Sequence, residues 1–299
     1  MRARWLDIAL ALSFLAVAGL PFYAGDYAVG VGLSFLMWVA LTQSWTVLSG
    51  LTGYVSIGHV VFYGLGAYVV VLLGTGLPLL VSLPLAGAAA FTFAMLIGYP
   101  VLRVRGPYFV ILTFGLAELV KYGVIALESY LGKFSRIMFG GPSLQTLFGV
   151  MLVLAGLATA LAWLVRRSRF GHGLMAIREN EEAAETIGIP IARFKLLAFA
   201  LSSIVPGMVG GTMVLRSSYF EPVPAFDPMI SLTMVTMAII GGSDDIRGPI
   251  LGAGLLVLVS EFLWARAPQV YMIIIGLLLI AFVLFAPGGV CGRLLRQRA

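Results

Sequence analysis

The hydrophobic positions of this chain form long uninterrupted runs and do not alternate with polar ones. The 75 residues from Ala28 to Leu102 contain no Asp, Glu, Lys or Arg. A helix needs about 20 apolar residues to cross a bilayer core of roughly 30 Å, so this stretch accommodates about three crossings. A β-barrel would instead show alternating segments of about ten residues. The pattern predicts an all-α, polytopic helical membrane protein.

Charged or glycine-rich breaks divide the chain into about ten candidate transmembrane spans. These are residues 5–25, 28–49, 54–74, 77–101, 108–128, 147–165, 196–215, 228–243, 249–265 and 268–287. We expect one transmembrane permease domain over residues 1–299, without a separate soluble domain. Glycine-rich breaks leave open whether the segments near 50–75 and 228–243 span fully or re-enter the membrane.

The positive charges predict the orientation of these spans. With the N-terminus inside, 14 of the 19 Lys and Arg residues fall in inside loops and termini. Inside loops carry an excess of Lys and Arg, and the reverse orientation would invert the ratio. We therefore expect a multi-pass protein of the cell (inner) membrane with both termini cytoplasmic. The first apolar segment has features of a signal peptide, but with so many spans following it we expect an uncleaved helix.

Composition narrows the class further. The chain is 61% hydrophobic and 11% charged, with a mean hydropathy of +1.04. Its net charge of +6 reflects the inside loops and does not predict nucleic-acid binding. Cys291 is the single cysteine, which excludes an internal disulfide and a cysteine-based zinc site. We expect no catalytic, cofactor or metal site.

Residues 166–195 are a charged island in this apolar sequence. They hold 10 of the 32 charged residues of the chain. The pattern predicts a short helix from Arg178 to Ile187, with Gly188 as its C-terminal stop and Pro190 preventing its continuation. Two interpretations remain open at this point: a helix that seats on a partner protein, and an amphipathic loop helix that only faces water.

Five segments resemble one family of transport subunits. They are G-L-T-G-Y-V-S-I-G-H (50–59), F-Y-G-L-G-A-Y (62–68), R-G-P-Y-F-V-I-L-T (105–113), A-I-R-E-N-E-E-A-A-E-T-I-G-I (176–189) and G-G-S-D-D-I-R-G-P-I-L-G-A (241–253). The fourth contains E-A-A-x-x-x-G, which resembles the coupling-helix motif of ABC-importer membrane subunits. Together the segments resemble the LivM-like branch of the branched-chain amino acid permeases, a family that includes urea-type systems.

The resemblance implies a role in ATP-driven import. The implied partners are two ATP-binding cassette ATPases, a homologous permease subunit and an extracytoplasmic solute-binding protein, all working in membrane lipid. The implied solutes are branched-chain amino acids first, and urea or short amides second. Residues 166–195 become a cytoplasmic coupling loop, and its expected ATPase-coupling residues are Arg178, Glu179, Asn180, Glu181, Glu182, Ala183, Ala184 and Gly188.

The chain departs from the family pattern at two places. Many importers continue the coupling motif into I-x-L-P, which residues 196–199 do not supply. Residues 243–247 read S-D-D-I-R, where the family usually has a neutral turn, so a role carried over to that turn is not assigned.

Helix breaks give the candidates for the solute pathway. They are Gly50, Gly53, Ser56, His59, Gly241 and Gly242. For His59, a structural hydrogen bond between packed helices is favoured over a pathway role, because a buried histidine is costly without a partner. Glu118 and Lys121 are three residues apart and are expected to pair on one helix face. Glu261 is expected to pair with Arg266 or with another subunit.

No ATP-binding motif occurs in the chain. A phosphate-binding loop needs G-K-[ST], and the only lysine that follows a glycine, Lys133, precedes Phe134. An ion-coupled secondary transporter of amino acids is the alternative, and it would require a cluster of intramembrane carboxylates. An intramembrane enzyme would require a catalytic constellation, and the two histidines, His59 and His172, do not form one in the sequence.

Overall fold

The computed structural model describes residues 2–74, 76–132, 135–138, 140–266, 276–277 and 291. In this part of the chain, helices account for nearly all the regular structure. Its elements are α1 (Arg2–Tyr23), α2 (Asp26–Thr52), α3 (His59–Leu73), α4 (Leu79–Val101), α5 (Pro107–Tyr130), β1 (Arg136–Ile137), α6 (Leu144–Arg167), α7 (Arg169–Glu179), α8 (Glu181–Thr186), α9 (Ile191–Ser217), β2 (Tyr219–Phe220), α10 (Pro222–Ala225), α11 (Pro228–Gly241) and α12 (Arg247–Arg266).

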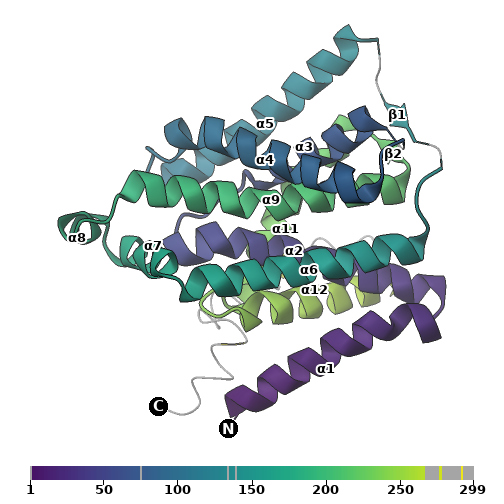
Figure 1. The fold of residues 1–299 in the computed structure, drawn as a ribbon, viewed down its shortest axis with the longest axis horizontal. Helices are drawn as coiled ribbons and strands as arrows, with labels where there is room; N and C mark the ends of the chain where they lie inside the picture. The colour runs from purple at the N-terminus through teal and green to yellow at the C-terminus, as the bar shows by residue number, and fades with distance from the viewer. Residues whose placement is uncertain are drawn as a thin grey trace.

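The bundle is organised around α2 and α9, two 27-residue helices with many buried residues. α6 packs along α2, α3 and α4 pack along α9, and α12 packs on α11 and α2. Figure 1 shows these long helices lying side by side, with α7 and α8 at one end and the β1–β2 pair at the other. We call these the α8 end and the β end.

Glycines bring α3 and α9 into backbone contact. A Cβ atom on Gly66 would lie 1.9 Å from the carbonyl oxygen of Gly207, and one on Gly210 would lie 1.9 Å from the carbonyl oxygen of Tyr63. Membrane helices gain little from the hydrophobic effect between themselves, so such close van der Waals packing holds them together. Small residues are therefore required at this crossing.

Six helical segments of the described chain are long and apolar enough to cross a membrane. They are Asp26–Thr52, Leu79–Val101, Pro107–Tyr130, Leu144–Arg167, Ile191–Ser217 and Pro222–Gly241. A multi-pass helical protein is confirmed, whereas the count of about ten spans is not. α1 is 22 residues long, and Ser13–Tyr23 is an apolar helical segment within it. The tenth predicted span, 268–287, lies almost wholly outside the described residues.

The predicted span 54–74 begins with a non-helical segment. α2 ends at Gly53, whose φ of +75° and N–H bond to the Ser49 carbonyl close the helix. Residues 53–58 form no helix, and α3 then runs for 15 residues, or about 22 Å at 1.5 Å per residue. This is shorter than a bilayer core of about 30 Å. Residues 53–58, which we call the break, are central to the candidate site.

The β end is closed by a small antiparallel pair. β1 pairs with β2 in the register Arg136–Phe220 and Ile137–Tyr219. Met138 extends the contact by donating its N–H to the Ser218 carbonyl at 2.9 Å. The loop between α5 and α6 is thereby fixed to the segment that follows α9.

Candidate functional site

The charged island folds into two short helices, not the single helix from 178 to 187 that the sequence predicted. α7 ends at Glu179 because Asn180 leaves helical geometry, with φ −160° and ψ 114°. The Asn180 side chain then caps α8 by accepting a hydrogen bond from the Ala183 N–H at 3.1 Å. Asparagine is a favoured helix N-cap, which explains why the break occurs at this residue.

Gly188 makes the turn between α8 and α9. Its φ is +86°, a conformation that glycine adopts without strain. Its N–H bonds to the Glu185 carbonyl at 2.9 Å, and the Ile189 N–H bonds to the Ala184 carbonyl at 3.1 Å. Gly188 is thus the helix stop that the sequence predicted, and α9 begins directly after Pro190.

Glu181 points into the protein and joins four segments. Lys195 Nζ of α9 lies 2.6 Å from Glu181 Oε1, and the Tyr54 hydroxyl of the break donates to the same oxygen. Arg105 Nε lies 3.1 Å from Glu181 Oε2, as an ion-pair contact without hydrogen-bond geometry. The side chains of Glu181 and Lys195 are only 14% and 4% exposed. Glu181 is therefore an internal tie between α8, α9, the break and the loop before α5.

The electrostatics of this cluster favour the ionised carboxylate. Burial alone raises the pKa of Glu181. Hydrogen bonds from Lys195 and Tyr54, together with the charges of Lys195 and Arg105, outweigh burial and hold the pKa below its ordinary value. Lys195 also donates to the Tyr54 hydroxyl at 2.8 Å and lies 4.2 Å from the centre of its ring. The break is thereby held through Tyr54 by both members of the ion pair.

Arg178 holds the other side of the break. Its Nη1 donates to the Gly50 carbonyl at 2.9 Å and to Asp244 Oδ1 at 2.7 Å. A Cβ atom on Gly53 would lie 3.2 Å from Arg178 Cγ. The last turn of α7 therefore contacts the end of α2 and the turn between α11 and α12 at once.

The outer surface of α8 is free of these contacts. Glu182, Ala183 and Glu185 are exposed, and Ile187 is 73% exposed at the tip of the loop. Ala184 is buried against the protein. Of the residues predicted to couple to an ATPase, Glu182, Ala183 and Gly188 face outward, whereas Arg178 and Glu181 make internal contacts.

The start of α3 is a meeting point of polar groups from several helices. His59 is fully buried, and its Nε2 lies 3.1 Å from Ser202 Oγ of α9. The Val60 N–H donates to Ser231 of α11 at 2.8 Å, and the Ile57 N–H donates to Thr113 of α5 at 3.2 Å. The hydrogen bond to a neighbouring helix that the sequence favoured for His59 is present, whereas its pathway role stays a prediction. The break leads directly into this junction.

The other predicted helix-break residues are packed against neighbours. The Ser56 carbonyl accepts from Trp45 Nε1 at 2.8 Å. A Cβ atom on Gly241 would lie 1.8 Å from the Gly248 carbonyl oxygen, and Gly242 has a φ of +96°. Gly241 and Gly242 thus form a tight turn beside Asp244. Whether these residues line a solute pathway stays a prediction.

Three carboxylates of the long helices have side-chain partners. Glu118 and Lys121 pair at 2.6 Å, as the sequence predicted. Glu128 is buried and accepts two bonds from Arg136, at 2.9 and 2.7 Å, and one from the Tyr68 hydroxyl at 2.6 Å. Glu261 accepts a hydrogen bond from Tyr27, a partner the sequence did not predict.

A cavity of about 250 Å³ lies at the β end between α3, α9 and α10. Ala67, Met213 and Val214 contribute apolar surface, and Tyr63 and Glu221 add polar groups. An apolar wall with a few polar groups is the common character of small-molecule sites. Among the described residues, no group of three or more His, Cys, Asp or Glu is arranged to hold a metal.

The Glu181 cluster was the part of the site that sequence reasoning missed. Tyr54, Arg105 and Lys195 are separated by 51 and 90 residues along the chain, so no local spacing reveals their contact with Glu181. One signal was present in the sequence. Lys195 lies in the second turn of a long apolar helix, where an isolated charge needs a partner.

Comparison with known proteins identifies relatives over most of the chain. Residues 9–283 match the family model described as "Branched-chain amino acid transport system / permease component". The high-affinity branched-chain amino acid transport system permease protein LivM of Salmonella typhimurium is 28% identical over 94% of this chain and 73% of its own length. LivM of Escherichia coli K12 is 29% identical over the same shares. The L-arabinose transport system permease protein AraH of E. coli K12 is 28% identical over 57% of this chain and 53% of its own. No solved structure matches.

Proposed function

The chain belongs to the family of branched-chain amino acid transport permease components, and from this premise we propose that it is the membrane-spanning subunit of an ATP-driven importer whose α7–α8 loop receives the force of partner ATPases. The observation that carries the proposal is the double attachment of this loop to the break. Arg178 bonds the Gly50 carbonyl just before the break, and Glu181 bonds the Tyr54 hydroxyl within it.

In this mechanism, α8 is the contact helix. Its exposed surface, with Glu182, Glu185 and Ile187, seats in a groove of an ATPase. ATP binding brings two ATPases together and displaces α8. Because Glu181 and Arg178 tie the loop to the break, the displacement reaches α3 and the junction at His59. Transport then follows from rocking of the helices between inward and outward access.

The orientation follows from the same assignment. The α8 end carries the charged island and faces the cytoplasm, and the β end faces outward. Fourteen of the 19 Lys and Arg residues then lie at the inside loops and termini, in agreement with the positive-inside rule. An extracytoplasmic solute-binding protein would approach the β end, and a homologous permease subunit would complete the pathway.

Branched-chain amino acids are the proposed solutes, with urea or short amides second. The family description and the names of the LivM relatives support the first choice. The cavity at the β end is consistent with it, because apolar side chains line its wall and Glu221 is available for an ammonium group.

The ion-coupled alternative receives less support from the structure. Glu118 pairs with Lys121, Glu128 pairs with Arg136, and Tyr27 donates to Glu261. These carboxylates lie in separate contacts and do not form the cluster that proton or sodium coupling would require.

Reconstitution tests the proposal directly. The chain would be purified with its partner ATPases and permease subunit, placed in proteoliposomes, and supplied with its binding protein and radiolabelled leucine or urea. Uptake should require ATP and persist when proton and sodium gradients are collapsed. Uptake that follows an ion gradient without ATP would establish the secondary transporter instead.

A further inference from the structure

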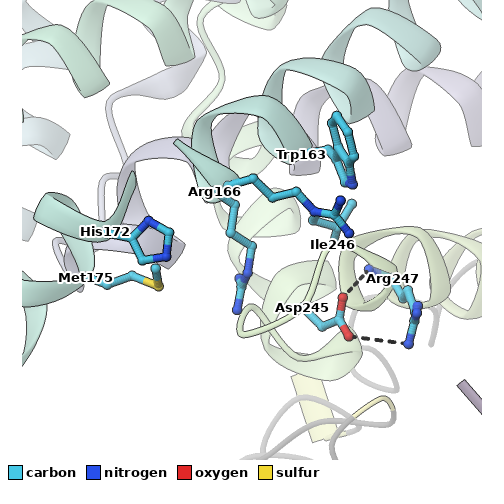
Figure 2. Close-up of a pocket in the computed structure, with 8 residues that line it drawn as sticks. Trp163, Arg166, His172, Met175, Asp245, Ile246 and Arg247 are labelled. Atoms are coloured by element: carbon cyan, nitrogen blue, oxygen red, sulfur yellow. Dashed lines mark hydrogen bonds and ion pairs between the residues drawn. The ribbon is translucent and has the colours of Figure 1, made fainter. Parts of the chain in front are cut away.

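Beside the α7–α8 loop, the structure contains a cavity of about 740 Å³ that the transport mechanism does not use. It lies between the end of α6, α7 and the turn before α12, as Figure 2 shows. Three arginines line it, namely Arg166, Arg167 and Arg247, with Asp245 as the carboxylate among the lining residues. Among the lining residues that the structure describes, three positive charges and one negative charge give a net charge of +2.

The contacts of these arginines leave positive charge in the cavity. The Arg167 guanidinium stacks over the Trp163 ring at 4.5 Å. Arg166 donates to the backbone carbonyl of Asp244. A ring and a carbonyl hold a guanidinium in place without cancelling its charge. Asp245 lies 3.7 Å from Arg247 and balances one of the three.

An exposed apolar ridge on α6 leads to this cavity. Val153, Leu157, Ala160 and Leu164 are all exposed, and Arg167 follows them at the same spacing. Steps of four, three, four and three residues place these five side chains on one face of the helix. The ridge therefore runs along the exposed surface of α6 and ends at a cationic group beside a tryptophan. Such a combination is typical of the membrane interface.

We propose that the cavity binds the phosphate-bearing headgroup of an anionic phospholipid from the leaflet at the α8 end, with the acyl chains of the lipid along the α6 ridge. Arginine forks bind phosphate oxygens bidentately, which suits Arg166 and Arg167. A free phosphate compound would use the cavity but not the ridge. The site is thus specific for a ligand that is both anionic and attached to hydrocarbon. It does not depend on which solute is transported.

A matched pair of arginines makes the proposal testable. Arg103 stacks over Tyr99 at 4.4 Å, nearly as Arg167 stacks over Trp163, but it is not among the residues that line the cavity. Arg103→Gln is therefore the control for Arg167→Gln. The full-length chain, purified in mild detergent with its partner subunits, would be titrated with phosphatidylglycerol and with phosphatidylcholine of identical acyl chains. Native mass spectrometry would count the bound lipids.

The expected result is selective loss of the anionic lipid. Arg167→Gln should weaken phosphatidylglycerol binding about fivefold, and Arg166→Gln should add a similar factor. Phosphatidylcholine binding and the Arg103→Gln control should change less than about twofold. Equal affinity for the two lipids, or an equal loss of phosphatidylglycerol binding in Arg167→Gln and in the Arg103→Gln control, would overturn the proposal. So would full displacement by millimolar inorganic phosphate, which would indicate a site for free anions. Normal lipid binding with loss of the ATPases would show a protein contact instead.

Discussion

Replacing Glu181 by Gln is the sharpest perturbation of the α7–α8 loop. Gln keeps the shape of the side chain and can still accept a hydrogen bond from Tyr54, but the charge is lost. Lys195, which is 4% exposed, is left without the carboxylate that lies 2.6 Å from its Nζ. A hydrogen bond to a charged group contributes about 1.5–3 kcal/mol. We therefore expect the docked position of α8 to lose about 2 kcal/mol, or roughly a 30-fold change in its equilibrium.

Hydrogen exchange measures this loss without any assumption about transport. Amides of residues 181–189 should exchange up to about 30-fold faster in Glu181→Gln. Glu182→Gln is the matched control, because the neighbouring carboxylate is exposed and surface changes usually stay within about 0.5 kcal/mol. The double variant Glu181→Gln with Lys195→Met should recover part of the protection, since it removes the stranded charge.

Variants of Glu181 and Glu182 also distinguish transmission of the ATPase movement to the break from binding of the ATPases to α8. Glu181→Gln should keep its partner ATPases but lose most ATP-driven uptake, because the outer surface of α8 is unchanged. Glu182→Lys should lose the ATPases themselves by reversing an outward charge. Equal hydrogen exchange in Glu181→Gln and Glu182→Gln would refute the division of α8 into an inner and an outer face. Loss of the ATPases in both Glu181→Gln and Glu182→Lys would refute it as well.

Three further predictions concern glycines and pH. Gly66→Ala should destabilise the purified chain by about 1–3 kcal/mol in thermal unfolding, because its Cβ would meet the Gly207 backbone; Gly115→Ala, with open space around it, should not. Gly188→Val should strain the turn by about 1–3 kcal/mol and reduce ATPase co-purification with membrane insertion intact, whereas Gly188→Asn, which tolerates a positive φ, should retain it. The pKa of Glu181 in the folded protein lies below its ordinary 4.5. Its stabilisation of the docked α8 should therefore be complete above that value and lost as the pH falls through the folded pKa. Hydrogen-exchange protection of α8 that is unchanged by acid would contradict this.

The lengths of the apolar runs and the positions of the charges predicted the class of the fold and the position of the loop. Long apolar runs gave the helices, and Gly188 with Pro190 marked the end of α8. The span count was less predictable, because an apolar segment looks the same whether it is helical throughout or begins with a non-helical break. In residues 53–58, the break is stabilised by distant groups such as Trp45 and Thr113. Their contacts satisfy backbone groups that would otherwise favour a continuous helix.

Charges near the loop were harder to interpret than hydrophobic positions. In the sequence, Glu181 and Glu182 are equivalent neighbours on a polar helix. In the structure, the first is 14% exposed and bonded to three segments, and the second faces water. A six-residue helix has too few turns to reveal its buried face by periodicity. The burial of Ala184 shows that the inner face of α8 includes this small residue as well as Glu181.

The two roles of charge in this loop follow from what surrounds each group. A carboxylate that faces water loses little on replacement, so its value lies in what it can contact outside the protein. A carboxylate surrounded by Lys195, Arg105 and Tyr54 is already committed to internal contacts. Arg178 is committed in the same way to Gly50 and Asp244. The internal charges therefore connect the loop to the break, and the external ones leave the loop a surface with which to bind a partner.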